Sequence, residues 1–273
     1  MTGTKLIMTF PVTATSHTLA AYRARGGYAT LQRALQTMRP EQITKEVAAS
    51  GILGHGGAAF PAGRKWGVIK LNDGLPHYLC ANADEGEPGT FKDRWILENA
   101  PHLLLESMLI SAYALQVRHA FVYIRGEFDL PYRRLAAAVE EAYAAGYFGE
   151  GILGTDFACD IVIYRGAGSY VCGEASALIT SIEGRKGYPR NRPPRLTVRG
   201  LYQKPTVINN VETLSNVAII VAKGGEEFRK IGTAKSPGTQ LVSISAAVST
   251  LVEMPPGTMH LSSPPPSTPP QSS

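Results

Sequence analysis

The fold of this chain is constrained most by four short apolar segments, at residues 78–81, 120–124, 161–164 and 205–208. Each is followed by a polar turn and then by a helical pattern. Apolar runs of this length, bounded by turn residues, are typical of buried strands. The alternation of helix and strand predicts an α/β fold, a Rossmann-like three-layer sandwich with a mostly parallel sheet. In such a fold the turns that follow the strands meet at one edge of the sheet, where ligands bind.

Helices are expected before and between these segments, and Gly51 is expected to end one of them as a C-cap. The helices are expected at residues 28–37 and 40–50, from about residue 65, from about residue 93, and at residues 98–115, 132–145 and 172–182.

A glycine loop at residues 53–66 precedes the first strand and has four glycines within ten positions. Glycine allows close approach of a ligand to the backbone, and successive N–H groups in such a loop can converge on an anion. Arg64 and Lys65 add positive charge, and Phe60 and Trp66 offer flat faces. These features suit a phosphorylated, ring-bearing cofactor.

The glycine loop is not a Walker A loop, because five residues separate Gly57 from Gly63 and no Ser or Thr follows Lys65. ATP binding of that type is therefore disfavoured. The alternative to a cofactor loop is an irregular surface loop, which glycines and prolines mark wherever they cluster.

An acidic block at residues 82–94 places three carboxylates and an amide within six positions. Such groups accept hydrogen bonds from sugar hydroxyls, ring N–H groups or a carboxamide. A solvated acidic turn before the helix near Asp93 is the alternative. The spacing matches no EF-hand loop, so a metal site is not predicted.

Two further segments have the same layout of apolar run, turn and helix. In the strand–turn–helix segment at residues 160–174, Gly173 lies five positions after Gly168, so the dinucleotide pattern G-x-G-x-x-G does not fit. In the asparagine turn at residues 205–214, Asn209 or Asn210 is expected to cap a helix. An ordinary strand-to-helix crossing and simple capping are the respective alternatives.

The four segments, in this order, resemble the family of the NADH-quinone oxidoreductase F subunit, the flavoprotein subunit of respiratory complex I, from about residue 22 to about residue 238. The diaphorase subunits of NAD(P)-linked hydrogenases and formate dehydrogenases are close relatives of that family. The resemblance implies hydride transfer from the nicotinamide C4 to the flavin N5, with the chemistry supplied by the cofactors and no catalytic side chain needed. It implies that FMN is held by Gly54, Gly56, Gly57, Lys65, Asn82, Asp84, Glu85, Tyr170, Gly173, Glu174, Asn209, Asn210 and Thr213.

For the nicotinamide nucleotide, the resemblance implies stacking on Phe60 and a contact from Glu87. The family usually has a second Glu where this chain has Ala175, near the adenosine ribose. A carboxylate there binds a 2′-OH and repels a 2′-phosphate, whereas an arginine does the reverse. With Arg192 and Arg195 nearby in the sequence, the hypothesis is a site for NAD(H) that tolerates or prefers NADP(H).

Residues 185–204 carry seven cations and no acid, and the net charge of the chain is +5. The alternative to an NADP(H) pocket is that these cations decorate a solvated loop or meet a partner subunit. The sequence contains no recognised nucleic-acid motif, so nucleic acid is not an expected partner.

Electrons are expected to leave through iron–sulfur centres on partner subunits toward quinone. The family's four-iron, four-sulfur cluster is not supported by this chain, because its three cysteines lack ligand spacing. No run approaches the roughly 20 apolar residues of a membrane span. The expected location is cytoplasmic, peripheral to the inner face of the membrane through partner subunits.

Four regions are expected along the chain: an N-terminal helical segment at 1–52, the FMN- and NAD(P)H-binding domain at 53–238, an incomplete ubiquitin-like (SLBB) domain at 239–260 that starts with a strand at 240–248, and a disordered Pro/Ser tail at 261–273. The family continues beyond this point, so the chain looks truncated. Two other readings stay open: a non-catalytic fragment and a generic module that binds a phosphate ligand.

Overall fold

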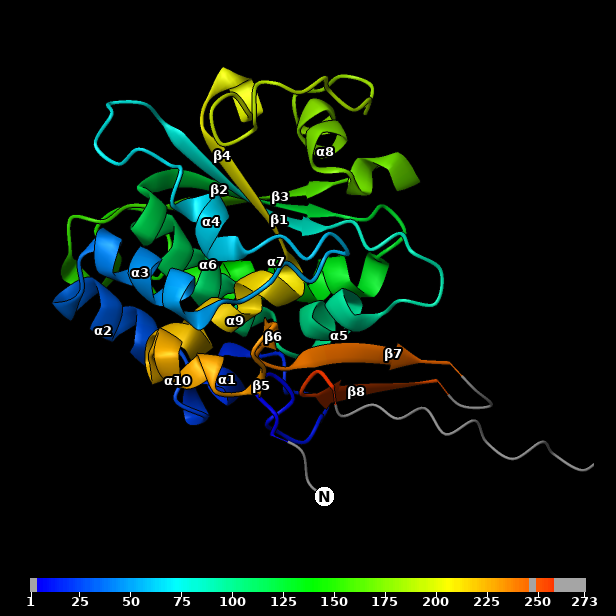
Figure 1. Ribbon diagram of the computed structural model, residues 1–273. Coiled ribbons are helices and arrows are strands. Elements are labelled where there is room, and N and C mark those ends of the chain that lie inside the picture. The colour runs from blue at the N-terminus through cyan, green and yellow to red at the C-terminus, as the bar shows by residue number, and fades with distance from the viewer. Residues whose placement is uncertain (1–3, 246–248, 258–273) are drawn as a thin grey trace, which may run out of the picture.

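A four-stranded parallel sheet organises the structure, a computed structural model that describes residues 4–245 and 249–257. Its strands are β1 (His77–Ala83), β2 (Val117–Ile124), β3 (Asp160–Arg165) and β4 (Thr206–Asn210), in the order β3-β2-β1-β4 (Figure 1). All three neighbouring pairs are parallel. The carboxyl ends of all four strands therefore lie at one edge, which we call the carboxyl edge.

Helices cover both faces of the sheet, which gives the predicted three layers. One face packs on α5 (Lys92–Asn99), α6 (Pro101–Leu115), α7 (Asp129–Ala144) and α9 (Val211–Lys223), and the other on α8 (Ala175–Ile182) with the 3₁₀ turns η2 (Tyr170–Gly173) and η3 (Leu201–Gln203) (Figure 1). Alternate residues of each strand face opposite layers. In β1, Leu79 and Ala81 join the large core under α6 and α9, whereas Cys80 joins the smaller core under α8.

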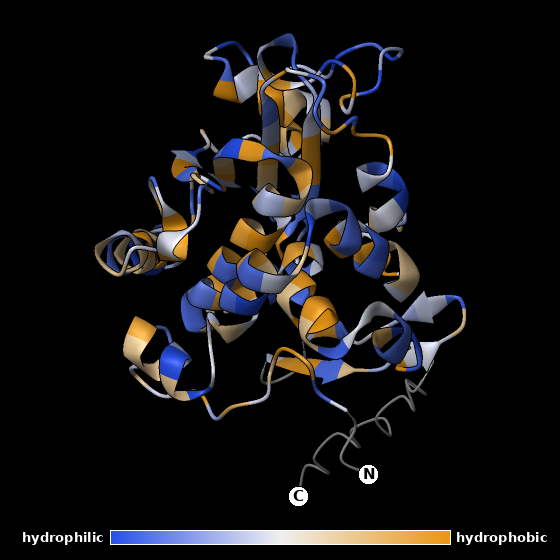
Figure 2. Ribbon diagram, turned by 90° about the vertical axis from the view of Figure 1, so that its left-hand side faces the viewer, coloured by the Kyte–Doolittle hydropathy of each residue, from blue (hydrophilic) through white to orange (hydrophobic). Residues whose placement is uncertain are grey.

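A further group of helices packs on the outside of α6 and α9: α1 (Leu19–Ala24), α2 (Ala29–Thr37), α3 (Pro40–Ser50) and α10 (Gly225–Arg229). The short helix α4 (Ala62–Trp66) contacts α3 and β4. Figure 2 shows orange apolar residues gathered in the strands and central helices, with blue polar residues toward the periphery. Gly51 ends α3 with φ 66°, as its predicted C-cap role requires. Among the described residues, no helix is long and apolar enough to cross a membrane.

The C-terminal part forms an antiparallel hairpin of β7 (Gln240–Ile244) and β8 (Thr250–Met254), next to a smaller pair of β5 (Gly232–Thr233) and β6 (Ser236–Pro237). The buried carboxylate of Glu253 on β8 accepts hydrogen bonds from the backbone N–H groups of Leu6, Ile7 and Met8 at 2.5–3.1 Å. The hairpin therefore anchors the start of the chain. The predicted strand at 240–248 ends at Ile244, and residues 246–248 and the tail at 261–273 lie outside the described residues.

Several predicted elements differ from the structure in their bounds or their burial. The helix expected at 98–115 begins at Pro101, and residues 98–99 belong to α5, since the residue preceding a proline disfavours the helical conformation. The helix expected from about residue 65 instead begins at Ala62 and ends at Trp66. The helix expected at 172–182 begins at residue 175, because Glu174 caps it. The strand at 161–164 was predicted to be buried, but β3 is an edge strand and Val162 is 43% exposed.

Candidate functional site

The four segments singled out in the sequence meet at the carboxyl edge. Three hydrogen bonds join the glycine loop to the asparagine turn. The backbone N–H of His55 donates to Oγ1 of Thr213 at 2.9 Å, the indole Nε1 of Trp66 donates to Oδ1 of Asn209 at 3.2 Å, and Nζ of Lys65 donates to the carbonyl of Ile208. These contacts bring together residues about 150 positions apart, because β1 and β4 are neighbours in the sheet.

The acidic block is joined to the strand–turn–helix segment in the same way. Nδ2 of Asn82 donates to the backbone carbonyl of Gly173 at 2.8 Å, and the hydroxyl of Tyr170 donates to Oε2 of Glu87 at 2.7 Å. The acidic block also reaches the asparagine turn, since Nδ2 of Asn210 donates to Oδ2 of Asp93 at 2.6 Å. All four segments therefore form one connected surface.

The glycine loop needs its glycines for two different reasons. Gly57 has φ +96°, a conformation that L side chains rarely adopt. A Cβ at Gly56 would lie 3.3 Å from Cβ of Asn210, so the loop approaches the asparagine turn closely. Phe60, further along the loop, is 46% exposed and presents its ring to the outside. The loop thus combines open backbone with an accessible aromatic face.

Lys65 and Trp66 lie on the short helix α4 that follows the loop. Nζ of Lys65 donates to the carbonyl of Ile208 at 2.5 Å, near the end of β4. Burial, helped by the charge of Arg192, lowers the pKa of Lys65 to about 8, so this lysine is mostly protonated at neutral pH. The expectation that Trp66 offers a flat face to a ligand was wrong, because its side chain is 1% exposed and packs in the core.

The carboxylate of Glu85, in the acidic block, is already hydrogen-bonded to the protein backbone. Its two carboxylate oxygens accept hydrogen bonds from the backbone N–H groups of Asp93 and Arg94, each at 3.0 Å. These are N–H groups of the first turn of α5, which have no partner within the helix. Burial, together with the nearby charge of Asp93, raises the pKa of Glu85 to about 7.

Asp84 differs from Glu85 in one respect that matters for a ligand. Its Oδ2 is buried and has no hydrogen-bond partner among the described residues. Burial raises the pKa of Asp84 to about 6, although the charge of Arg125 opposes the rise. Buried polar atoms are almost always paired, so this orphaned oxygen on the acidic block indicates a place where a ligand donates a hydrogen bond.

A buried network of charged side chains near the glycine loop was not predicted from the sequence. Nζ of Lys92 lies 2.8 Å from Oδ1 of Asp93 and 3.0 Å from Oε2 of Glu212, and Nδ1 of His55 lies 3.4 Å from Oε1 of Glu212. Burial alone would lower the pKa of Lys92, but the two carboxylates raise it. The sequence signal that could have indicated this network is an acidic residue in the first turn of each of α5 and α9.

On the other side of the sheet, Glu174 caps α8. Its Oε2 accepts hydrogen bonds from the backbone N–H groups of Ser176 and Ala177 at 2.7 and 3.0 Å, and its Oε1 accepts one from Arg192 at 2.6 Å. Burial favours a higher pKa for Glu174, but these hydrogen bonds and the charge of Arg192 lower it. Glu174 is therefore ionised at neutral pH and ties residue 192 to the site.

Comparison with known proteins identifies this arrangement. The Nuo51 FMN-binding domain family matches residues 47–219, which include all four segments. The chain belongs to this family. The NADH-quinone oxidoreductase F subunit numbered 2 in Rhizobium meliloti is 50% identical over 232 residues, and the match covers 85% of this chain and 55% of that protein. The NADH-quinone oxidoreductase F subunit of Escherichia coli is 43% identical over 243 residues, which cover 88% of this chain and 55% of that protein.

A solved structure of an NAD⁺-reducing [NiFe]-hydrogenase in the H₂-reduced state has the same fold, with a TM-score of 0.73 and 39% identity. The match covers 82% of this chain and 40% of the hydrogenase chain. The chain spans about half the length of the NADH-quinone oxidoreductase relatives that it matches.

In this member of the Nuo51 FMN-binding domain family, only some of the residues predicted to bind a nicotinamide nucleotide contact the four segments directly. Glu87 contacts Tyr170, which is 67% exposed, and Ala175 is the first residue of α8. Arg192 contacts Glu174, as described. Arg195 is exposed, and none of the contacts found among the described residues joins its side chain to the four segments. The structure thus joins Arg192 directly to the site, and the place of Arg195 there stays a prediction.

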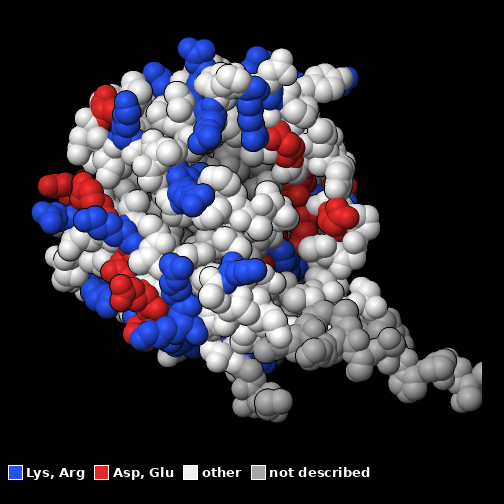
Figure 3. All heavy atoms as spheres, in the orientation of Figure 1, with Lys and Arg blue, Asp and Glu red and all other residues white. Residues whose placement is uncertain are grey.

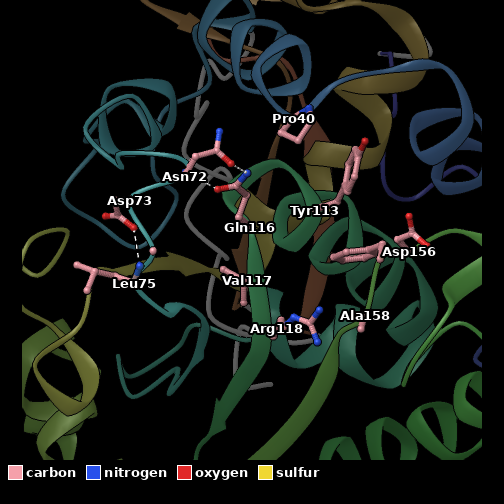
Figure 4. Close-up of a pocket in the computed structure, with 12 residues that line it drawn as sticks. Pro40, Asn72, Asp73, Leu75, Tyr113, Gln116, Val117, Arg118, Asp156 and Ala158 are labelled. Carbon is pink, nitrogen blue, oxygen red and sulfur yellow. Dashed lines mark hydrogen bonds between the residues drawn. The ribbon is translucent and has the colours of Figure 1, made fainter.

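A separate hollow of about 480 Å³ lies at the opposite edge of the sheet, near the amino ends of β1 and β2 (Figure 4). Asn72, Tyr113, Gln116 and Arg118 line it, and the amide groups of Asn72 and Gln116 bond to each other at 2.7 Å. Since residues of the four segments do not line this hollow, it is distinct from the candidate site.

Proposed function

We propose that this chain binds FMN at the carboxyl edge and reduces it with a nicotinamide nucleotide, as the flavoprotein part of a larger electron-transfer assembly. The observation that carries the proposal is the convergence of four distant segments at the carboxyl edge, where one of them presents the orphaned Oδ2 of Asp84. Membership in the Nuo51 FMN-binding domain family supports the identity of the ligand.

The side chains and backbone present at this edge fit FMN. The carboxylate of Asp84 can accept a hydrogen bond from a ring N–H, open backbone at Gly57 allows close approach, and the buried ammonium of Lys65 supplies positive charge for an anionic ligand. We propose that the set holding FMN is Gly54, Gly56, Gly57, Lys65, Asn82, Asp84, Glu85, Tyr170, Gly173, Glu174, Asn209, Asn210 and Thr213.

Within that set, some residues position the loops and others are free to bind the ligand. Asn82, Glu85 and Thr213 already bond to protein groups, so they hold the loops in place for the ligand. Asp84 and the exposed backbone at Gly57 have free binding capacity. When bound, FMN supplies hydride acceptance from the nicotinamide and onward transfer of electrons.

For the nicotinamide nucleotide we propose the exposed ring of Phe60 as a stacking surface and Glu87 as a polar contact. Ala175, Arg192 and Arg195 are the residues proposed to admit NADP(H) beside NAD(H), because an alanine at position 175 places no carboxylate against a 2′-phosphate.

The onward path of the electrons is part of the same proposal. We propose iron–sulfur subunits as partners, in a complex I-type assembly that reduces quinone, with peripheral attachment to the cytoplasmic side of the membrane. The match to an NAD⁺-reducing hydrogenase supports a diaphorase role as the alternative. The four regions at 1–52, 53–238, 239–260 and 261–273 remain the proposed division of the chain.

Anaerobic titration tests the proposed reaction. The chain is purified, loaded with FMN, freed of unbound flavin and mixed with NADH while flavin absorbance is followed. The proposal predicts bleaching of the flavin band in stoichiometric proportion to NADH. Retained flavin that NADH does not bleach would refute the dehydrogenase role and favour a non-catalytic fragment. The Phe60→Ala variant should need more NADH for the same rate, whereas Leu75→Ala, another exposed apolar side chain far from the site, should behave as wild type.

A further inference from the structure

We propose that a hollow lined by Arg190, Arg192 and Arg199 is a phosphate site, and that it takes the 2′-phosphate of NADPH. The use of this site by a nucleotide rests on the proposed function, whereas the phosphate site itself rests on the hollow alone.

The hollow has a volume of about 140 Å³ and lies beside α8, in the basic segment of residues 185–204. About 10–15 Å³ of such volume holds one water molecule, so the hollow has room for a phosphate group. Three arginines line it, together with Asn191 and Gln203. None of its described lining residues is acidic. Figure 3 shows the corresponding concentration of blue Lys and Arg side chains at the top of the molecule, over α8 and this segment.

Arg190 forms the fixed wall of the hollow. Its guanidinium donates to Oγ1 of Thr180 at 2.9 Å, to the carbonyl of Gly200 at 3.2 Å and to Oε2 of Glu183 at 2.6 Å. Its backbone N–H donates to Oγ of Ser176 at 2.8 Å. These bonds hold the arginine in one conformation before any ligand binds, which reduces the entropy lost on binding.

Arg192 and Arg199 retain donors for a ligand. One nitrogen of Arg192 donates to Glu174, which leaves its other N–H groups for an anion. Arg199 is exposed, and among the described residues its guanidinium forms no ion pair. A terminal phosphate carries about two negative charges and three acceptor oxygens, and guanidinium groups bind such oxygens in pairs.

The carboxylates that face this region are already neutralised. Glu174, at the start of α8, is paired with Arg192, and Glu183, after its end, is paired with Arg190 and Arg185. Between these two carboxylates the exposed surface of α8 starts with Ala175 and contributes no acid. These pairs offset part of the arginine charge as well, but among the described residues four arginines (Arg185, Arg190, Arg192 and Arg199) meet only these two carboxylates, so a net positive charge remains at the hollow.

The hollow is continuous with the candidate site through the first turn of α8. Arg192 bonds to Glu174 and Arg190 bonds to Ser176, and the charge of Arg192 contributes to the lowered pKa of Lys65 in the glycine loop. In this proposal, a dinucleotide extends from the glycine loop across the start of α8, with its adenosine end at the hollow. The phosphate at that end that distinguishes NADPH from NADH is the 2′-phosphate.

Calorimetry with two small ligands tests the phosphate site without requiring turnover. 2′,5′-ADP and 5′-AMP differ only by the 2′-phosphate, so their affinities for the purified chain isolate its contribution. We expect 2′,5′-ADP to bind at least 10-fold more tightly at low salt. Arg199→Gln should remove most of that preference and leave 5′-AMP unchanged. The matched control is Lys186→Gln, which removes a positive charge from the same segment but from a residue that does not line the hollow.

Equal affinities for the two ligands would overturn the phosphate site. So would an equal loss of 2′,5′-ADP affinity in Lys186→Gln and Arg199→Gln, because the attraction would then be diffuse. The role in turnover is measured separately on FMN-loaded chain, where Arg199→Gln should raise the KM for NADPH about 10-fold and leave that for NADH unchanged. If NADH bleaches the flavin and 2′,5′-ADP shows no preference, the proposed function stands and the phosphate site fails. If flavin is not retained, the proposed function fails and the calorimetry still decides the phosphate site.

Discussion

Replacement of Asp84 by Asn is expected to stabilise the flavin-free chain while weakening its hold on FMN. In the folded state burial raises the pKa of Asp84 from 3.8 to about 6, and its Oδ2 lacks a partner among the described residues. At about 1.4 kcal/mol for each pKa unit, the ionised carboxylate costs about 3 kcal/mol. Because the side chain is partly exposed, solvent screening reduces this to about 1.5 kcal/mol.

The sign of the pH dependence follows from the raised pKa. Below pH 3.8 the group is protonated in both states and costs nothing; the cost grows as the pH rises through 6 and is complete above about 7. Asp84→Asn avoids this cost, so its advantage in the free energy of unfolding should be about 1.5 kcal/mol at pH 8 and about half of that at pH 5. For a domain of this size, 1.5 kcal/mol corresponds to roughly 3–6 °C in Tm.

Thermal unfolding of the flavin-free wild type and variant at pH 5 and pH 8 measures this difference. Asp156→Asn, at an exposed position, is the matched control and should change stability by less than about 0.5 kcal/mol at both pH values. A variant less stable than wild type at pH 8, or a gain that does not change with pH, would refute the reasoning. The same variant should bind FMN more weakly, because the carboxylate is retained for the ligand at the expense of stability.

Three other substitutions test the connections between the loops. Trp66→Phe should lower the free energy of unfolding by about 2 kcal/mol, measured in urea, because it leaves the buried Oδ1 of Asn209 without its donor; an unchanged midpoint would show that this bond is unimportant. Glu212→Gln should cost about 2–4 kcal/mol because Lys92 then loses one of its two buried carboxylates, and a neutral result would contradict the charge network. Gly56→Ala should reduce FMN retention several-fold while changing stability by less than about 1 kcal/mol; full retention would show that close approach at this position is not needed.

The sheet and the meeting of the four segments were predictable because both depend on local patterns. Short apolar runs predict strands, and parallel strands separated by helices place the turns after them at one edge. The start of α6 at Pro101 was predicted wrongly, although the sequence contained the signal, since a proline restricts the residue before it.

Pairings between distant residues were not predictable, because no local pattern specifies them. Lys92 and Glu212 pair across 120 positions, and neither residue differs in type from ordinary surface charges. The burial of Trp66 follows from the short helix α4 turning its indole toward β4, where it meets Asn209. The positions of Arg190 and Arg192 depend on bonds to α8 that a proline-rich segment does not reveal.

Equilibrium titration of the flavin-free chain with FMN, followed by flavin fluorescence, is the most direct test of a flavin site at the carboxyl edge. One FMN should bind per chain with a Kd of roughly micromolar or tighter, and the affinity should fall in Asp84→Asn but not in Asp156→Asn. A well-folded chain that binds no FMN, or binds it equally well in both variants, would contradict the account.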